Sequence, residues 1–267
     1  MKIKVLIAMH KPYSIPKDSC YLPVHVGAAG KDTFSIFGWN VQRDDDGVNI
    51  SEKNPNFCEL TGLYWAWKTL NAAVIGLVHY RRHLSDCSRA YCKKHPWEDC
   101  VVCSSKLEEL FSTCDIVVPR KTIYGIETLY SHYSHTHDGR HLDLTRELIG
   151  KMCPEYLSDC DKVYRQRGGH MYNMMIAKRE VLDQYCQWLF PILFELEKVV
   201  DVDGLSTFDA RLFGRVSEIL FNVWLRHHPE YRVGSLRVLN TDPISWPKKI
   251  MSFLRAKFLG KKYGASF

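Results

Sequence analysis

The sequence predicts an α/β fold with one central sheet, and three observations lead to this prediction. Residues 3–9 (IKVLIAM), 73–79 (AVIGLVH) and 114–118 (CDIVV) are short apolar runs without polar alternation, the pattern of strands that are buried on both faces. Segments with apolar residues at helical spacing separate and follow these runs. Strands that alternate with helices indicate a single domain whose mostly parallel sheet is flanked by helices.

The elements can be justified in order. The first strand ends before Pro12, because proline interrupts strand pairing. Residues 56–70 carry apolar side chains at helical spacing behind Pro55, and a proline near the first position favours a helix start. The later elements are helices over 141–152, 154–164, 179–199 and 209–227, and strands over 170–177 and 231–239.

Length and hydropathy exclude several classes of protein. The 267 residues are 46% hydrophobic, enough for a sizeable core. No uncharged apolar run approaches the roughly 18–20 residues of a membrane span. The run VLIAM between Lys4 and His10 is too short for the core of a signal peptide. The sequence therefore favours a cytoplasmic protein, and its ten cysteines are interpreted as reduced thiols.

The positive charge is concentrated at the C-terminus. Residues 246–267 hold six of the 36 basic residues and no acidic one, so residues 1–245 carry 30 basic and 30 acidic residues. A neutral body argues against a nucleic-acid partner. In residues 246–263 apolar side chains recur on one side, at Ile250, Phe253, Leu254 and Phe258. This pattern predicts a basic amphipathic helix at an anionic membrane surface; the alternative is a helix that docks on the protein body.

The cysteine-rich segment leaves two readings open. Cys100 and Cys103 form a CxxC pair, whereas Cys87 and Cys92 are separated by four residues. Structural zinc sites usually combine two closely spaced pairs. Ordinary thiols are therefore favoured over a zinc site here.

The sharpest motif is VIGLVHYRRHL at 74–84, where a buried strand runs directly into His79, Tyr80, Arg81 and Arg82. In open α/β sheets ligands bind beyond the carboxyl ends of the strands. Arginine side chains suit phosphate oxygens because they are always charged and bind in a bidentate manner. We expect an anion or diphosphate site here, with a surface ion-pair cluster as the alternative.

A second segment, 44–68, places polar groups before a helix. Asp44 to Asp46 precede a glycine, which favours an exposed turn over a metal site. The polar residues Asn49, Lys53 and Asn54 lie just upstream of a helix N-terminus, where free N–H groups attract anions. Trp65 and Trp67 are two residues apart, so one is expected in the core and the other beside a pocket.

Two further segments carry charged or histidine side chains. In the helix predicted over 209–227, Arg211, Arg215 and Glu218 share one stripe, either as a solvated charge ladder or as a general base near arginines. Residues 130–141 hold His132, His135, His137 and His141. These histidines suit a metal site, a polar and aromatic loop that binds sugar hydroxyls, or a surface segment without a functional role. The lone Asp201-Val202-Asp203 follows a helix, so it is a weak candidate for a nucleotide–metal motif.

Several of these motifs together resemble a known family. The order HKPY (10–13), NISEKN (49–54), ELTGLYWAWK (59–68), GLVHYRR (76–82), DIVVP (115–119), YNMMIAKREVLDQYCQWLF (172–190) and ARLFGRVSEILFNVWL (210–225) is similar to that of bacterial glycosyltransferases of capsular and exopolysaccharide biosynthesis. The resemblance spans residues 3–240. It implies a GT-A-like domain over 1–245 with a membrane-associating tail over 246–267. In some members it implies inverting transfer of galactofuranose from its UDP-sugar to a β-linkage.

The resemblance also assigns roles to residues. Donor or UDP binding would involve His10, Pro12, Tyr13, Asn49, Lys53, Asn54, Tyr64, Trp65, His79, Tyr80, Arg81, Arg82, Gly169, His170, Asn173 and Arg211. Glu218, or else Asp209, would be the general base, and His132, Tyr133 and His135 would contact the acceptor. HYRR stands where other GT-A enzymes carry a metal-binding Asp-x-Asp, so the sequence predicts no required cofactor or metal, and arginines that neutralise the UDP leaving group directly.

The partners follow from the same resemblance. They are a UDP-sugar, a saccharide acceptor that is linked to a lipid, and the inner face of the plasma membrane, which the tail would contact. The sequence leaves one alternative of another class open, a non-catalytic scaffold that binds nucleotide sugars within a polysaccharide assembly complex. Only the absence of a well-placed Asp-x-Asp favours that alternative.

Overall fold

A computed structural model of the chain describes residues 1–242, and its contacts divide the chain into two compact units. Unit 1 comprises Met1–Arg120, Tyr172–Gln187 and Pro229–Thr241, and unit 2 contains Lys121–Met171 and Trp188–His228. The prediction of one catalytic domain over 1–245 stays a prediction, and the predicted helix at 246–263 lies outside the described residues. No helix in residues 1–242 is both long and apolar enough to cross a membrane.

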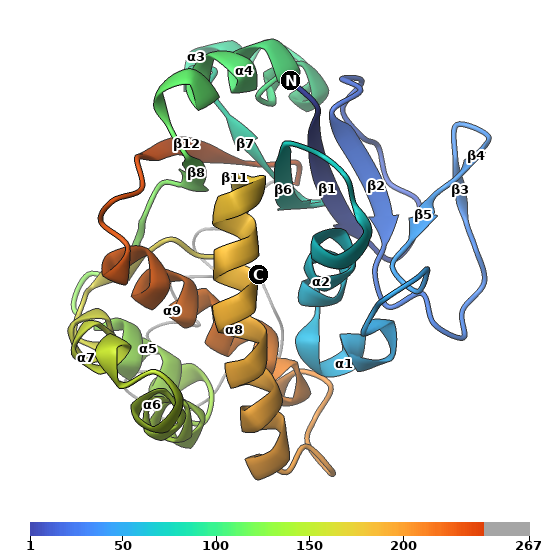
Figure 1. The fold of residues 1–267 in the computed structure, drawn as a ribbon. Helices are drawn as coiled ribbons and strands as arrows, with labels where there is room; N and C mark the ends of the chain where they lie inside the picture. Colours follow the sequence, from blue (N-terminus) through green and yellow to red (C-terminus); the bar gives the residue numbers. More distant parts are fainter. Residues whose placement is uncertain (243–267) are drawn as a thin grey trace. The chain divides into compact units, whose positions relative to one another are not determined.

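Within the described residues, unit 1 is built on an eight-stranded sheet with the order β11-β8-β12-β7-β6-β1-β2-β5 (Figure 1). Its strands are β1 (Ile3–Met9), β2 (Tyr21–His25), β5 (Gln42–Arg43), β6 (Val74–His79), β7 (Arg82–Ser85), β8 (Ile116–Pro119), β11 (Met175–Lys178) and β12 (Val233–Asn240). A separate hairpin joins β3 (Ser35–Ile36) and β4 (Trp39–Asn40). The strands expected at 3–9, 73–79, 114–118 and 231–239 are therefore present.

The sheet is mixed, which corrects the expectation of a mostly parallel one. The pairs β5–β2, β2–β1 and β1–β6 are parallel, as is β12–β8. The pairs of β6 with β7 and β11, of β11 with β8, and of β12 with β7 are antiparallel. Only two residues, Tyr80 and Arg81, connect β6 to β7, and so short a connection can join only antiparallel strands.

Helices and 3₁₀ turns complete unit 1. They are η1 (Ser51–Lys53), α1 (Asn54–Phe57), α2 (Leu60–Thr69), α3 (Arg89–Cys92), η2 (Trp97–Cys100), α4 (Ser104–Thr113) and the first half of α8 (Arg179–Val199). The helix expected over 56–70 is divided because Cys58 adopts a φ of 53° between α1 and α2. Arg179 caps the end of α2, since its guanidinium donates to the carbonyl oxygens of Trp67 and Leu70 at 2.7 Å each.

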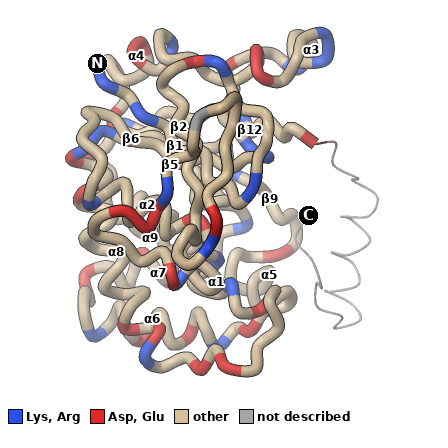
Figure 2. Tube along the Cα trace, turned by 90° about the vertical axis from the view of Figure 1, so that its right-hand side faces the viewer, with Lys and Arg blue, Asp and Glu red and all other residues tan. Residues whose placement is uncertain are grey.

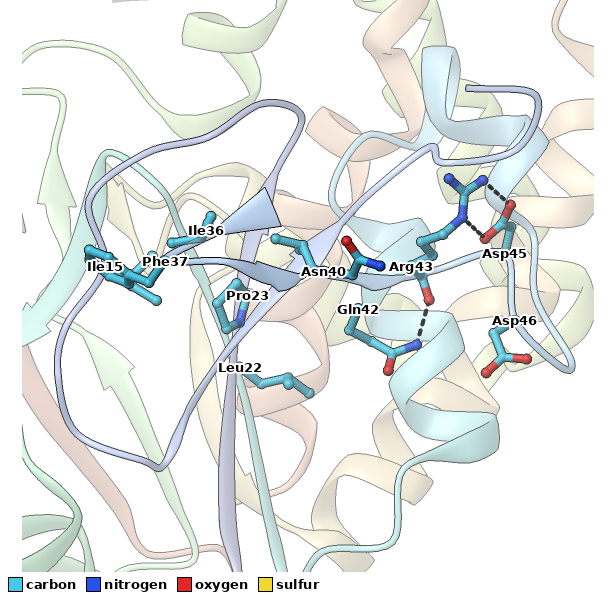
Figure 3. Close-up of a pocket in the computed structure, with 11 residues that line it drawn as sticks. Ile15, Leu22, Pro23, Ile36, Phe37, Asn40, Gln42, Arg43, Asp45 and Asp46 are labelled. Atoms are coloured by element: carbon cyan, nitrogen blue, oxygen red, sulfur yellow. Dashed lines mark hydrogen bonds and ion pairs between the residues drawn. The ribbon is translucent and has the colours of Figure 1, made fainter. Parts of the chain in front are cut away.

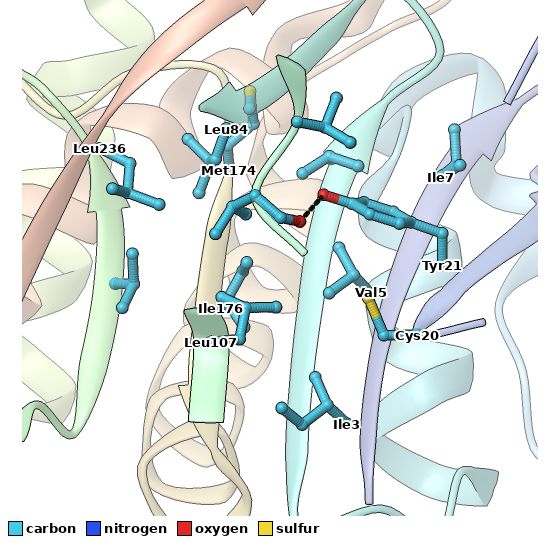
Figure 4. Packing of buried hydrophobic residues seen from close by; sticks show 14 of the residues in the cluster. Ile3, Val5, Ile7, Cys20, Tyr21, Leu84, Leu107, Met174, Ile176 and Leu236 are labelled. Atoms are coloured by element: carbon cyan, nitrogen blue, oxygen red, sulfur yellow. Dashed lines mark hydrogen bonds between the residues drawn. The ribbon is translucent and has the colours of Figure 1, made fainter. Parts of the chain in front are cut away.

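The core of unit 1 lies on β1 and its neighbours. Val5, Ile7 and Met9 are buried in one apolar cluster, which also contains Ile176 of β11 (Figure 4). Tyr21 of β2 reaches into this cluster and donates its hydroxyl to the Val102 carbonyl oxygen at 2.8 Å. Burying side chains of this size contributes roughly 1.5–3 kcal/mol each, so the cluster fixes the strand ends that carry the polar residues described below.

Gly76 in the middle of β6 permits a close approach of β11. Ile176 is its partner across the sheet. A Cβ atom at position 76 would lie 2.8 Å from the Ile176 Cγ1 atom and 3.1 Å from the Met175 carbonyl oxygen. With isoleucine at 176, any side chain at position 76 would therefore force the two strands apart.

Unit 2 is mainly helical. Its elements are β9 (Thr122–Ile123), α5 (Leu129–Thr136), α6 (Arg140–Met152), η3 (Pro154–Tyr156), α7 (Leu157–Tyr164), β10 (Gly168–Gly169), the second half of α8, η4 (Asp209–Arg211) and α9 (Leu212–His227). The helices expected over 141–152, 154–164, 179–199 and 209–227 are therefore confirmed, with short 3₁₀ turns at two of their starts. Figure 2 shows acidic and basic residues interspersed along the described trace, in agreement with the balanced charge of residues 1–245.

Candidate functional site

In unit 1, two adjacent parallel strands deliver predicted donor residues to one place. β1 and β6 pair in register, with Ala8 opposite His79. The rings of Tyr13 and Tyr80, which follow these strands, stack with their centroids 4.0 Å apart and an interplanar angle of 19°. His10 packs edge-on against Tyr80 at 5.2 Å. The carboxyl ends of β1 and β6 thus form an aromatic cluster, with the exposed Pro12 between His10 and Tyr13 in sequence.

Cationic side chains surround this cluster. The Lys11 ammonium group lies 5.5 Å from the centre of the Tyr13 ring, and the Arg81 guanidinium lies 5.2 Å from that of Tyr80. Arg82 begins β7 and lies over a different ring, that of Tyr172, at 4.7 Å. Burial raises the pKa of Tyr80, so its hydroxyl is neutral at pH 7. Aromatic faces beside guanidinium and ammonium groups can bind a planar base and an anion together.

Hydrogen bonds hold an unusual turn at Tyr172 and Asn173, where Arg82 lies over the Tyr172 ring. His79 Nε2 lies 2.6 Å from the Tyr172 carbonyl oxygen, which can only accept, so this nitrogen carries the proton. Asn173 donates to the buried Glu59 carboxylate at 2.7 Å. Tyr172 and Asn173 have φ angles of 74° and 52°, a left-handed conformation that is rare outside glycine. Such strain persists mainly where the surroundings impose it, often at functional sites.

This turn also corrects the strand that was expected over 170–177. Only Met175–Lys178 forms β11, because the positive φ angles at Tyr172 and Asn173 are incompatible with an extended strand. Neither residue is glycine, so the only sign of the turn in the sequence was Asn173, a residue type that is enriched in this conformation. Glu59 was likewise missed as a partner of Asn173, since the two lie 114 residues apart in the sequence.

Asp44 has a role that the sequence did not predict. It is fully buried rather than part of an exposed turn, and its carboxylate accepts hydrogen bonds from the Gly27 and Ala28 backbone N–H groups at 2.8 and 3.0 Å. The hydroxyl groups of Ser51 and Thr61 also donate to it. One carboxylate therefore joins the loop after β2 to η1 and α2.

Two other predicted residues of this segment, Asn49 and Asn54, form hydrogen bonds within the fold. Asn49 donates to the Asp45 and Gly47 carbonyl oxygens and accepts from the Ser51 N–H, so it shapes a turn. Asn54 donates to the Cys58 carbonyl oxygen at 2.8 Å. Their neighbour Lys53, in η1, is half-buried.

The aromatic residues of α2 divide between core and surface, as expected for two tryptophans two residues apart. Trp65 is buried, whereas Tyr64 and Trp67 are half-buried. Lys68 lies over the Trp67 ring, with its ammonium group 3.4 Å from the ring centre. The role of Trp65 in donor binding stays a prediction, and its burial places it in the packed interior of unit 1.

In unit 2, one asparagine anchors the predicted Gly169–His170 segment to α9. Asn222 accepts from the His170 N–H at 2.8 Å and donates to the His170 carbonyl oxygen at 2.9 Å. The same amide donates to the Glu218 carbonyl oxygen one turn earlier. A Cβ atom at Gly169 would lie 2.9 Å from the Asn222 Oδ1 atom, so any side chain there would displace this amide from its hydrogen bonds to His170. Sequence reasoning missed Asn222, because it lies within an apolar helix.

The two candidate bases differ in how they are held. Asp209 in η4 accepts a hydrogen bond from the Ser206 hydroxyl at 2.7 Å, while Glu218 is half-buried on α9. Arg211 is exposed at the end of η4. Arg215 lies 3.1 Å from His137 Nδ1 and over the Phe208 ring at 3.9 Å, so it does not simply form a solvated charge ladder.

The histidine-rich segment is helical rather than the loop that was expected. Residues Leu129–Thr136 form α5, and the Thr128 and Ser131 side chains form a reciprocal capping box at its start. The buried Glu127 accepts from His132 Nδ1 at 2.8 Å and from His135 Nδ1 at 2.6 Å. Burial opposes the charge on Glu127, but these two hydrogen bonds outweigh it and lower its pKa. Glu127 thus orients both imidazole rings.

Tyr133 lies in the electrostatic neighbourhood of both candidate bases. Burial is the main cause that raises its pKa. The positive charge of Arg215 acts in the opposite direction, whereas the carboxylates of Glu218 and Asp209 add to the increase. Unit 2 thereby brings the predicted acceptor residue Tyr133 and the predicted base Glu218 into one charged environment.

No metal centre is found within residues 1–242. In this part of the chain, no group of three or more His, Cys, Asp and Glu side chains is arranged to hold a metal ion. Cys87, Cys92, Cys100 and Cys103 are free thiols, of which Cys100 is buried and Cys103 exposed. The prediction that no cofactor is required stays a prediction.

Comparisons with known proteins identify a family and a similar solved structure. A family model described as a domain of unknown function, DUF4422, matches residues 4–229, and the chain belongs to this family. No curated protein matches the sequence. Among solved structures, the apo structure of WbbM, a bifunctional glycosyltransferase, is similar with a TM-score of 0.80 and 26% sequence identity. The similarity covers 91% of this chain and 46% of WbbM, so the chain spans about half the length of that protein.

Proposed function

We propose that the chain is a glycosyltransferase domain that uses a UDP-sugar donor. The observation that carries this proposal is the cluster at the carboxyl ends of β1 and β6, where the stacked Tyr13 and Tyr80 adjoin Lys11 and Arg81. Strand ends of this kind are where open α/β sheets bind ligands. The similarity of the fold to a bifunctional glycosyltransferase supports the same activity here.

The chemistry follows from the charges of these residues. An aromatic face binds the uracil ring, while Arg81 and Arg82 bind the diphosphate. As the bond from the anomeric carbon to the phosphate oxygen breaks, negative charge grows on the UDP leaving group, and the guanidinium groups stabilise it. A carboxylate, Glu218 in this proposal, takes the proton from the acceptor hydroxyl. The hydroxyl oxygen then attacks the anomeric carbon from the side opposite the leaving group, and the configuration at that carbon is inverted.

The finer proposal concerns the sugar and the place of action. We propose galactofuranose as the transferred sugar, a β-linkage in the product, and a growing capsular or O-antigen polysaccharide on a lipid as the acceptor. The resemblance of the motifs at 10–13, 49–54, 59–68 and 76–82 supports this choice. The basic and apolar pattern of residues 246–263 supports a peripheral position at the inner face of the plasma membrane.

Two measurements test the proposal. Calorimetric titration of the chain with UDP should show saturable binding that weakens about 10- to 100-fold in Arg81→Ala, while the exposed Arg89→Ala serves as the control with unchanged affinity. UDP release should then depend on UDP-galactofuranose and rise with a saccharide acceptor, with UDP-galactopyranose as the matched donor. Absence of UDP binding, or equal binding by Arg81→Ala, would contradict the donor site. Binding without any acceptor-dependent release would favour the scaffold alternative.

A further inference from the structure

A hollow in unit 1 lies beside the β3–β4 hairpin, and neither of the stacked tyrosines lines it. Its volume is about 760 Å³, within the range of pockets that bind small molecules. Ile15, Leu22, Pro23 and Ile36 give it an apolar wall, and the remaining lining residues come from the hairpin and from β5 and the loop that follows it (Figure 3). None of these residues belongs to the donor cluster.

Phe37 is the least expected of the residues that line this pocket. It occupies the loop of the β3–β4 hairpin with Gly38, and both residues have positive φ angles, 51° and 80°. A two-residue hairpin loop with two positive φ angles matches a type I′ turn, for which Asn-Gly is the favoured sequence. Phe37 is also 79% exposed. A bulky aromatic residue here is strained and solvated, which costs stability without any benefit to the fold.

The polar side of the pocket is well suited to hydroxyl groups. Arg43 is fully engaged, since it binds Asp45 through two hydrogen bonds of 2.9 and 2.6 Å and donates to the Ala28 and Lys31 carbonyl oxygens. The carboxylate of Asp46 has no partner among residues 1–242, and it lines the pocket with Asn40 and Gln42. The carboxylate accepts hydrogen bonds from hydroxyl groups, and the amide side chains can both accept and donate them.

The charge of the pocket excludes a phosphate ligand. One guanidinium, that of Arg43, stands against two carboxylates, those of Asp45 and Asp46, so the lining carries a net charge of −1. The hydrogen bonds from Arg43 lower the pKa of Asp45, which keeps this carboxylate ionised. A negatively charged pocket repels a nucleotide diphosphate, whereas a neutral molecule that is rich in hydroxyls meets no such repulsion.

We propose that this pocket binds a neutral saccharide, with the exposed face of Phe37 against the C–H face of a sugar ring and Asp46 on its hydroxyl groups. The aromatic ring contributes through apolar contact, and the carboxylate through charge-assisted hydrogen bonds. Resting on the proposed glycosyltransferase function, the saccharide is a unit of the acceptor chain. The pocket then selects the acceptor, while the cluster at the ends of β1 and β6 selects the donor.

The decisive variant is Phe37→Asn, because it restores the favoured Asn-Gly turn. We expect its melting temperature to be equal to or higher than that of the unaltered chain. Saturation-transfer NMR with methyl β-D-galactopyranoside, methyl β-D-galactofuranoside and methyl α-D-glucopyranoside should show binding of at least one glycoside to the unaltered chain. Phe37→Asn should weaken that binding about tenfold or more. Asp46→Ala should weaken it several-fold, and Tyr91→Asn, an exposed aromatic on α3, should not change it.

The outcomes separate this proposal from the proposed function. No signal from any of the three glycosides, or an unchanged signal in both Phe37→Asn and Asp46→Ala, would overturn the saccharide pocket. A parallel titration with UDP should be unaffected by both substitutions. If UDP fails to bind while a glycoside binds in a Phe37-dependent manner, the donor proposal is wrong and the saccharide pocket stands.

Discussion

The two units hold their candidate residues in different ways. In unit 1 they follow strands, and the rings of Tyr13 and Tyr80 meet because β1 and β6 are parallel neighbours in register. In unit 2 they lie on or beside helices, where Glu127 fixes two histidines and Asn222 fixes the Gly169–His170 segment. Strand ends give unit 1 a site that depends on sheet register, whereas unit 2 depends on individual side-chain hydrogen bonds.

The candidate residues of the two units also have different charged neighbours. The residues around the Tyr13–Tyr80 stack are Lys11 and Arg81, both cationic. The environment of Tyr133 in unit 2 is mixed, with the guanidinium of Arg215 and the carboxylates of Glu218 and Asp209. Under the proposed function, the cationic residues of unit 1 would bind the anionic donor and a carboxylate of unit 2 would accept a proton. Four experiments test these proposed roles and the contacts that hold the surrounding residues in place.

Glu218→Gln should give the largest effect. If Glu218 is the general base, the loss of a proton acceptor should lower kcat about 10²- to 10⁴-fold, with KM for the donor unchanged. Steady-state rates of acceptor-dependent UDP release measure this, and the melting temperature shows whether the variant folds. Asp209→Asn is the matched control, since Asp209 is bound to Ser206. A normal kcat in Glu218→Gln, with a large loss in Asp209→Asn, would transfer the role to Asp209.

Asp44→Asn should destabilise unit 1 by about 2–5 kcal/mol. Four donors point at this buried carboxylate, and an amide NH₂ in place of one oxygen sets donors against donors. Chemical denaturation with an optical probe measures the change. Asp46→Asn, at an exposed position two residues away, should change stability by less than about 0.5 kcal/mol. Equal effects of the two substitutions would show that the Asp44 network does not support the fold.

Arg81→Ala and Arg82→Ala should each weaken UDP binding about 10- to 100-fold, because one charge-assisted contact contributes about 1.5–3 kcal/mol. Arg81→Lys and Arg82→Lys should recover only part of the loss, since lysine keeps the charge but not the bidentate geometry. Calorimetry at several salt concentrations provides the affinities. A loss confined to Arg82, which lies over Tyr172 rather than Tyr80, would move the anion site toward the Tyr172 turn.

The smallest effect is expected from Glu127, which accepts hydrogen bonds from His132 and His135. The pKa of Glu127 is lowered in the folded chain. Ionised Glu127 therefore stabilises the fold at pH values above 4.5, the ordinary pKa of this side chain. That contribution is lost as the pH falls through the lower folded pKa. Glu127→Gln should therefore cost about 1 kcal/mol at pH 7 and progressively less below pH 4.5. Glu155→Gln, at an exposed position in the same unit, should show no such trend. A stability cost of Glu127→Gln that does not depend on pH would contradict this role of the ionised Glu127.

Much of the framework could be predicted from the sequence. The apolar runs at 3–9 and 73–79 predicted β1 and β6, and the apolar periodicity over 179–199 and 209–227 predicted α8 and α9. These patterns are strong because each element buries apolar side chains at the regular spacing of a strand or a helix. Two strand ends of the candidate site were therefore visible in the sequence.

The rest depended on contacts between distant residues. Asp44 is buried only because donors at positions 27, 28, 51 and 61 converge on it, and no local pattern reports that. The Tyr172–Asn173 turn lacks glycine, and α5 carries histidine, tyrosine and serine rather than a clear apolar stripe. Tyr80 and Arg81 resembled the end of a strand, but their sequence did not show that the chain turns back there.

Gly76 carries a consequence for how this sequence can change over time. The spacing between β6 and β11 that it permits also sets the distance from His79, three residues further along β6, to the carbonyl of Tyr172. A single methyl group at position 76 would widen that spacing and disturb the imidazole contact without touching any polar residue. We therefore expect relatives of this chain to accept alanine at 76 only together with a smaller residue at 176, so that these two positions covary.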